Sequence, residues 1–218
     1  MLLIVLSGAF AGLLHSVSGP DHLTAVAPLA VDDPRRGWLA GWLWGLGHSA
    51  GVIVIAMMAI TFRDWLPPLE VLSQWSERLV GAALIAVGLW ALRRAARIET
   101  RAHDHSHGIH RHLYVQHGPG WLRRYGHAHA SFALGILHGS AGSSHFFGVL
   151  PALALPSRSA SLLYIGAFGL GTVAAMTVFT TLVGHASTRY GARALPQRAL
   201  MLTSALGALV VGGVWLVA

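Results

Sequence analysis

The chain has 218 residues, of which 54% are apolar and 11% are charged, whereas charged residues make up about 25% of an average soluble domain. So few charges cannot cover a soluble protein of this size, so the composition excludes a soluble enzyme and indicates an integral membrane protein. All 15 basic residues are arginine and there is no cysteine, which excludes lysine Schiff-base chemistry, disulfides and thiolate metal sites.

Six apolar stretches approach the ~20 residues that a helix needs to cross a bilayer. They cover residues 2–30 (interrupted), 38–62, 79–92 with flanks, 131–155, 160–184 and 199–218. The third is short, and an amphipathic start near Leu69 is an alternative for it. The sequence therefore predicts an all-α polytopic membrane protein with six transmembrane helices.

The first stretch contains a helix break inside the membrane. Gly19 and Pro20 interrupt it, and Pro20 suits the first position of a second half-helix that Asp21 and His22 then continue. With His15 on the other side of the break, two imidazoles and a carboxylate converge on one place. Ionisable groups within a membrane span are functional by default, and this ligand set suits Ni(II), Co(II) or Zn(II). Interhelical hydrogen bonding is the structural alternative.

His48 lies in the second stretch, within the run Gly-Leu-Gly-His-Ser-Ala-Gly. Small neighbours allow another helix to approach closely, so His48 is a candidate for a further metal ligand. A histidine bonded to a backbone carbonyl is the alternative.

The central segment holds eight of the 14 histidines. We interpret it as a flexible metal-binding tract, because alternating polar residues cannot bury a core; a soluble linker is the alternative. Its candidate ligands, weaker than those in the membrane, are His103, His105, His107, His110 and His112.

The two halves of the chain resemble each other. A shift of 123 positions places His15 on His138 and His22 on His145, and a shift of 124 places Gly45 on Gly169. Each copy has three spans, so the copies are inverted, as in transporters with a midplane site. We expect His138 and His145 to face the same cavity as the first-half histidines, with the first helix of each copy broken.

This repeat predicts the domain organisation. Residues 1–97 form the first three-helix repeat, 98–129 a His-rich cytoplasmic loop and 130–218 the second three-helix repeat. With six spans, 12 arginines lie on the side of the loop and 3 on the other, so that side is cytoplasmic by the positive-inside rule. Both termini then face outward. The excess of basic over acidic residues is explained by the topology of the protein in a lipid bilayer, so no nucleic-acid partner is expected.

The membrane motifs resemble the short six-span, UreH-like branch of the nickel/cobalt transporter (NiCoT) superfamily, whose members include urease-accessory-type membrane proteins. That family carries a His-x4-Asp-His signature followed in the next helix by Gly-His-Ser. The corresponding runs are His15…Asp21-His22, with five intervening residues rather than four, and Gly47-His48-Ser49. The resemblance implies nickel or cobalt transport across a bacterial cytoplasmic (inner) membrane, and a His-rich loop occurs in efflux-type members.

The leading prediction is a secondary transporter of Ni(II) or Co(II), with Zn(II) also compatible, and not an enzyme. The cation is cargo, so no permanently bound cofactor is expected. A P-loop is impossible without lysine, while import, export and the coupling ion stay open. The alternatives are a b-type haem protein using paired intramembrane histidines and a non-transporting metal-delivery partner for urease or hydrogenase maturation. A second copy of the chain and a metallochaperone are further partners left open.

Overall fold

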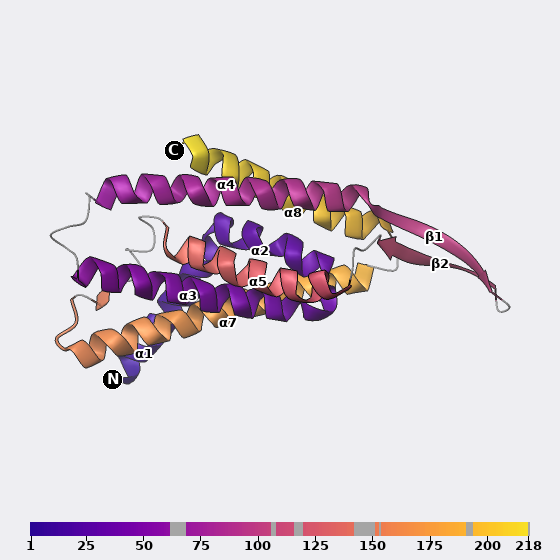
Figure 1. Ribbon diagram of the computed structural model, residues 1–218. Helices are drawn as coiled ribbons and strands as arrows, with labels where there is room; N and C mark the ends of the chain where they lie inside the picture. Colours follow the sequence, from indigo (N-terminus) through magenta and orange to yellow (C-terminus); the bar gives the residue numbers. More distant parts are fainter. Residues whose placement is uncertain are drawn as a thin grey trace.

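The computed structural model describes residues 1–61, 69–105, 108–115, 120–141, 151–152, 154–190 and 194–217. Within these ranges the chain is mostly helical, and a two-stranded hairpin projects from one end of the bundle (Figure 1). The elements are α1 (Leu2–Ser18), α2 (Pro20–Asp32), the short 3-10 helix η1 (Pro34–Arg36), α3 (Gly37–Thr61), α4 (Leu69–Ala96), β1 (Ile98–His105), β2 (Gly108–Val115), α5 (Gly120–Gly139), α7 (Arg158–Tyr190) and α8 (Ala194–Val217). Both termini lie at the end of the bundle away from the hairpin.

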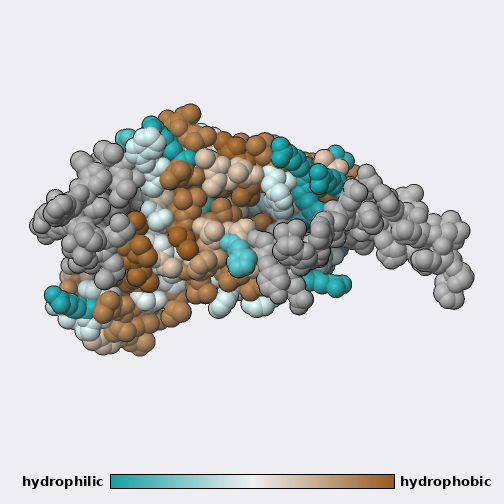
Figure 2. Space-filling view, viewed as in Figure 1, coloured by the Kyte–Doolittle hydropathy of each residue, from teal (hydrophilic) through white to brown (hydrophobic). Residues whose placement is uncertain are grey.

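Four helical segments of the described residues are long and apolar enough to cross a membrane. They are Pro34–Ile55, Gln74–Ala96, Arg158–Arg189 and Leu195–Val217, and the bent pair of α1 and α2 makes a fifth if it is counted as one span. Figure 2 shows apolar surface along the middle of the bundle and hydrophilic patches toward its ends. The chain is therefore a multi-pass helical membrane protein, as its composition predicts. Of the stretch predicted at 131–155, α5 covers the part up to Gly139, and residues 142–150 and 153 lie outside the described residues.

The helix break predicted at Gly19 and Pro20 is confirmed. Helix α1 ends at Ser18, α2 begins at Pro20, and the two are bent by 73°. Gly19 has ordinary extended dihedral angles, so a left-handed conformation is not the reason for glycine here. A Cβ at this position would instead lie 2.5 Å from His22 Nδ1 and 2.9 Å from Asp21 Oδ1. Glycine is needed because these two side chains fold back closely over the break.

Helix α2 occupies the middle of the bundle, which explains why most of its residues are buried. It packs against α3, α4, α5, α7 and α8, and its residues 25–31 are all buried. Around it, α1 packs along α7, α3 packs along both α5 and α7, and α4 packs along α8. The side chains of Asp21 and His22, which fold back over the helix break, are thereby held deep inside the protein.

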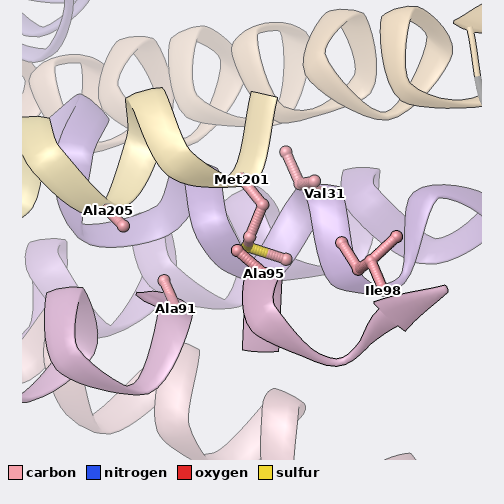
Figure 3. Close-up of a cluster of buried hydrophobic side chains, with 6 residues drawn as sticks. All are labelled: Val31, Ala91, Ala95, Ile98, Met201 and Ala205. Atoms are coloured by element: carbon pink, nitrogen blue, oxygen red, sulfur yellow. The ribbon is translucent and has the colours of Figure 1, made fainter. Parts of the chain in front are cut away.

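One end of α2 is fixed by an apolar cluster that also anchors the hairpin. Figure 3 shows Val31 of α2 and Ile98 of β1 with side chains of α4 and α8. The complete buried cluster is Val31, Ala91, Ala95, Ile98, Met201 and Ala205. Next to it, the buried carboxylate of Asp32 pairs with the Arg94 guanidinium, so the hairpin begins on a rigid part of the bundle.

The His-rich segment differs from the predicted flexible tract, because β1 and β2 pair as antiparallel strands. The register sets His103 opposite His110 and Arg101 opposite His112. Ile98 of β1 and Ile109 and Leu113 of β2 fall on one face of this register, which Asp104 and Arg111 share. Helix α5 also begins at Gly120, ten residues before the boundary expected for the second repeat.

Candidate metal centre

Three histidines from three helices meet inside the bundle. His15 is on α1, His22 on α2 and His48 on α3, and one ligand nitrogen from each can be chosen so that all three lie within 4.8 Å of one another. The ring centroids are 4.7 Å apart for His15 and His22, 5.4 Å for His15 and His48, and 5.2 Å for His22 and His48. His22 and His48 are at most 2% exposed, and His15 is half-buried. We call these three residues the histidine triad.

A carboxylate lies directly beside the triad. Asp21 is 4% exposed, and its Oδ2 is 3.5 Å from His22 Nε2. It occupies the first turn of α2, where the helix dipole favours a negative charge. The triad therefore has an acidic neighbour, and a cation bound there would have a counter-charge within the same helix turn.

The second half of the chain contributes His138, from the last turn of α5. This side chain is 1% exposed, and its ring centroid is 6.0 Å from that of His22. Its Nδ1–H donates to the Leu134 carbonyl oxygen at 2.9 Å, which leaves the lone pair on Nε2. Metal-ligating histidines are commonly oriented by such a bond from their other nitrogen, so His138 has the tautomer that a ligand requires.

Two aromatic side chains line the same region, and the sequence analysis did not identify them. Trp44 is fully buried and stacks on His48, with centroids 4.9 Å apart and ring planes 14° apart. It also contacts His22 and His138, at 5.2 and 5.6 Å. Phe168 of α7 contacts His15 at 5.5 Å. The spacing of Trp44 and His48 was a usable signal, because residues four apart lie on one face of a helix.

The other candidate ligands are placed differently. His145 and His107 lie outside the described residues. His103 and His105 lie on β1, and His110 and His112 lie on β2, in the hairpin beyond the end of the bundle. The structure thus brings together five of the six intramembrane candidates, His15, Asp21, His22, His48 and His138, and separates the hairpin candidates from them.

The donor set of this centre determines which cations it can hold. It consists of imidazole nitrogens and a carboxylate oxygen, and the chain has no cysteine. Such ligands suit borderline divalent ions such as nickel, cobalt and zinc better than magnesium or calcium, which prefer oxygen alone.

The chain is similar to a known membrane family over most of its length. Residues 23–215 match the family described as "Cytochrome C biogenesis protein transmembrane region". The chain is also 32% identical to the urease accessory protein UreH of Bacillus sp. (strain TB-90), over 84% of this chain and 77% of that protein. No solved structure matches the chain significantly.

Two plant proteins are similar as well. The Arabidopsis thaliana proteins named Chloroplast protein FOR GROWTH AND FERTILITY 2 and 1 are 36% and 35% identical to it, each over 83% of this chain. These matches cover 47% and 49% of the plant proteins. The chain therefore spans about half the length of these two relatives.

Proposed function

The chain belongs to the family of cytochrome C biogenesis protein transmembrane regions and is a relative of the urease accessory protein UreH, and on this basis we propose that it transports a divalent transition-metal cation across a membrane. Ni(II) and Co(II) are the favoured cargo, and Zn(II) is compatible with the same ligands. Placement in the wider nickel/cobalt transporter superfamily, and a location in a bacterial cytoplasmic membrane, are part of this proposal.

The observation that carries the proposal is the convergence of His15, His22 and His48 inside the bundle, within 4.8 Å. Nitrogens that bind one ion at about 2.1 Å are about 3.0–3.4 Å apart. An ion bound in common would therefore draw the three ligand nitrogens closer together than 4.8 Å. Burying several polar rings in a membrane protein is costly, and a cation that they bind in common offsets this cost.

Asp21 and His138 complete the proposed site with different roles. Asp21 supplies a negative charge, which lowers the energy of a dication away from water. His138 presents Nε2 at the side of His22, so it is placed to receive the ion from the triad or to pass it on. In this proposal the first half binds the cargo, and the second half acts as a gate or relay.

The packing of the helices supports two inverted three-helix repeats around this site. Under the shifts of 123 and 124, α1 corresponds to α5 and α3 corresponds to α7. Helix α1 packs on α7, and α5 packs on α3. The first contact therefore corresponds to the second when the two halves are aligned. A six-span arrangement, with residues 1–97 and 130–218 as the repeats and 98–129 between them, accounts for this pairing.

Glycines at equivalent positions make the correspondence specific. A Cβ at Gly12 would clash with the Phe168 carbonyl oxygen, and a Cβ at Gly135 would clash with the Trp44 carbonyl oxygen. The two glycines are 123 positions apart and the two aromatic residues 124 apart. Two close helix contacts of the same kind therefore lie at corresponding positions of the two halves, and this supports the proposed repeat.

The hairpin is proposed as an auxiliary metal-holding element. In its register, alternate residues of one strand and the residues opposite them share one face of the ribbon. This places His103, His105, His110 and His112 on one face. Because the hairpin lies at the end of the bundle, it would hold ions next to the pathway and not within it. By the distribution of arginines, this end is the cytoplasmic one.

Metal flux into liposomes tests the function directly. Purified full-length protein is reconstituted, and uptake of Ni(II), Co(II) and Zn(II) is followed with an enclosed metal-sensitive dye. We expect saturable flux of at least one of these ions, and loss of that flux in His22→Ala. The ring of His22 is the one that lies next to those of His15, His48 and His138. Flux equal to that of empty liposomes would favour the metal-delivery alternative, in which the protein hands metal to maturation factors without moving it.

A further inference from the structure

We propose that Trp44 is the positioning residue of the histidine triad, because it fixes the ring plane of His48. Its indole lies face to face with that imidazole, with centroids 4.9 Å apart and planes 14° apart. The inference rests on the proposed function, since it concerns the same metal site. It assigns a role to a residue that carries no ligand atom for the ion.

The imidazole of a histidine needs such a constraint. Rotation about its outer side-chain bond is soft, so the ring plane of His48 alone could tilt freely relative to His15 and His22. A flat neighbour stacked on the ring disfavours this tilt and keeps the imidazole parallel to the indole. The ring of His48 is thereby held ready before an ion arrives, which reduces the entropy lost on binding.

Trp44 can impose this constraint because it is itself held firmly. It is fully buried, in a cluster with Val26, Leu29, Ala40 and Met176. On the side of α5, Gly135 lets the backbone approach so closely that a Cβ there would clash with the Trp44 carbonyl oxygen. The indole is therefore packed by side chains of α2, α3 and α7 and contacts His138 of α5, so its orientation is a property of the packed bundle.

The second half of the chain provides a natural control. The residue equivalent to Trp44 is Phe168, which meets His15 at 5.5 Å with ring planes 39° apart, so it is tilted and not stacked. The residue equivalent to His48 is Thr172, which has no ring to orient; its hydroxyl donates to the Gly12 carbonyl oxygen at 3.4 Å. The same position in the fold therefore holds an aromatic side chain twice, and only Trp44 is stacked on a histidine.

Co(II) binding to the purified full-length protein separates positioning from general packing. The visible absorption of Co(II) depends on the number and geometry of its ligands, and the signal of the site is the difference between the wild type and His22→Ala. We expect Trp44→Leu to bind Co(II) at least tenfold more weakly, with a changed spectrum at saturation. Trp44→Phe, which keeps a ring for stacking, should stay within about threefold of the wild type with an unchanged spectrum.

Phe168→Leu is the matched control, and we expect it to weaken Co(II) binding clearly less than Trp44→Leu. The inference is overturned if Trp44→Leu keeps the wild-type affinity and spectrum, if Trp44→Phe is as weak as Trp44→Leu, or if the two leucine variants are equally impaired. Should Trp44→Leu not fold, Trp44→Met supplies apolar bulk without a ring face. If the wild type and His22→Ala give the same Co(II) signal, the proposed metal site fails, whatever the Trp44 variants do.

Discussion

The two halves of the chain build closely similar helix crossings but carry different chemistry. Gly12 and Gly135 allow equivalent close contacts, whereas His48 corresponds to Thr172 and Trp44 to Phe168. Asp21 corresponds to Ser144 in the sequence. The backbone contacts at these two glycines are thus alike, while the proposed ligands and the carboxylate are concentrated in the first half. This difference indicates that the scaffold and the site can be tested separately.

The largest effect is expected when Asp21 loses its negative charge. The corresponding residue of the second half, Ser144, has no charge. Asp21→Ser gives the first half the residue of the second, and we expect metal flux in liposomes to fall by at least a hundredfold. A dication loses its nearby counter-charge in a medium of low dielectric constant, where charges interact strongly. Asp21→Glu should retain more flux than Asp21→Ser. Equal flux in Asp21→Ser and the wild type would show that this carboxylate has no part in transport.

The helix crossings should instead respond equally in the two halves. Gly12→Val and Gly135→Val each introduce bulk against a backbone carbonyl, and overpacking of this kind costs about 1–3 kcal/mol or more. We expect similar losses in thermal stability for the two variants, measured in detergent. Gly166→Val is the control, since no atom lies within 4 Å of a Cβ there. A large loss in one half alone would contradict the equivalence of the two crossings.

A smaller effect is expected for the one imidazole that the second half places in the site. His138→Ala should lower metal flux by roughly tenfold and weaken metal binding less than His15→Ala does. The reason is that the three remaining histidines still form the triad. Parallel titrations of the two variants with Ni(II) check this order. If His138→Ala weakens Ni(II) binding more than His15→Ala does, the proposed roles of the two halves are reversed.

Much of this asymmetry could be predicted from sequence, because it depends on residue types with strong local effects. Gly19 and Pro20 identify the helix break, and ionisable groups within apolar stretches identify the proposed ligands of the first half. The neighbourhood of Trp44 could not be predicted in the same way. Its contacts with His22 and His138 depend on how α2 and α5 pack against α3, and a single sequence does not specify that packing. The hairpin was missed because the segment was interpreted by its histidine content, and the charged residues Asp104 and Arg111 between neighbouring histidines leave neither strand with a clear alternation of apolar and polar residues.

The smallest effect on transport is expected in the hairpin, which lies between the two proposed repeats. Replacing His103, His105, His110 and His112 together by alanine should lower the number of metal ions bound per chain while flux changes by less than about twofold. These positions share one face of the register in a hairpin at the end of the bundle, so they lie outside the apolar part that contains the proposed pathway. Equilibrium dialysis counts the ions and the liposome assay measures the flux in the same preparation. Complete loss of flux would place the hairpin within the pathway, and the contrast between the two halves would then no longer account for transport.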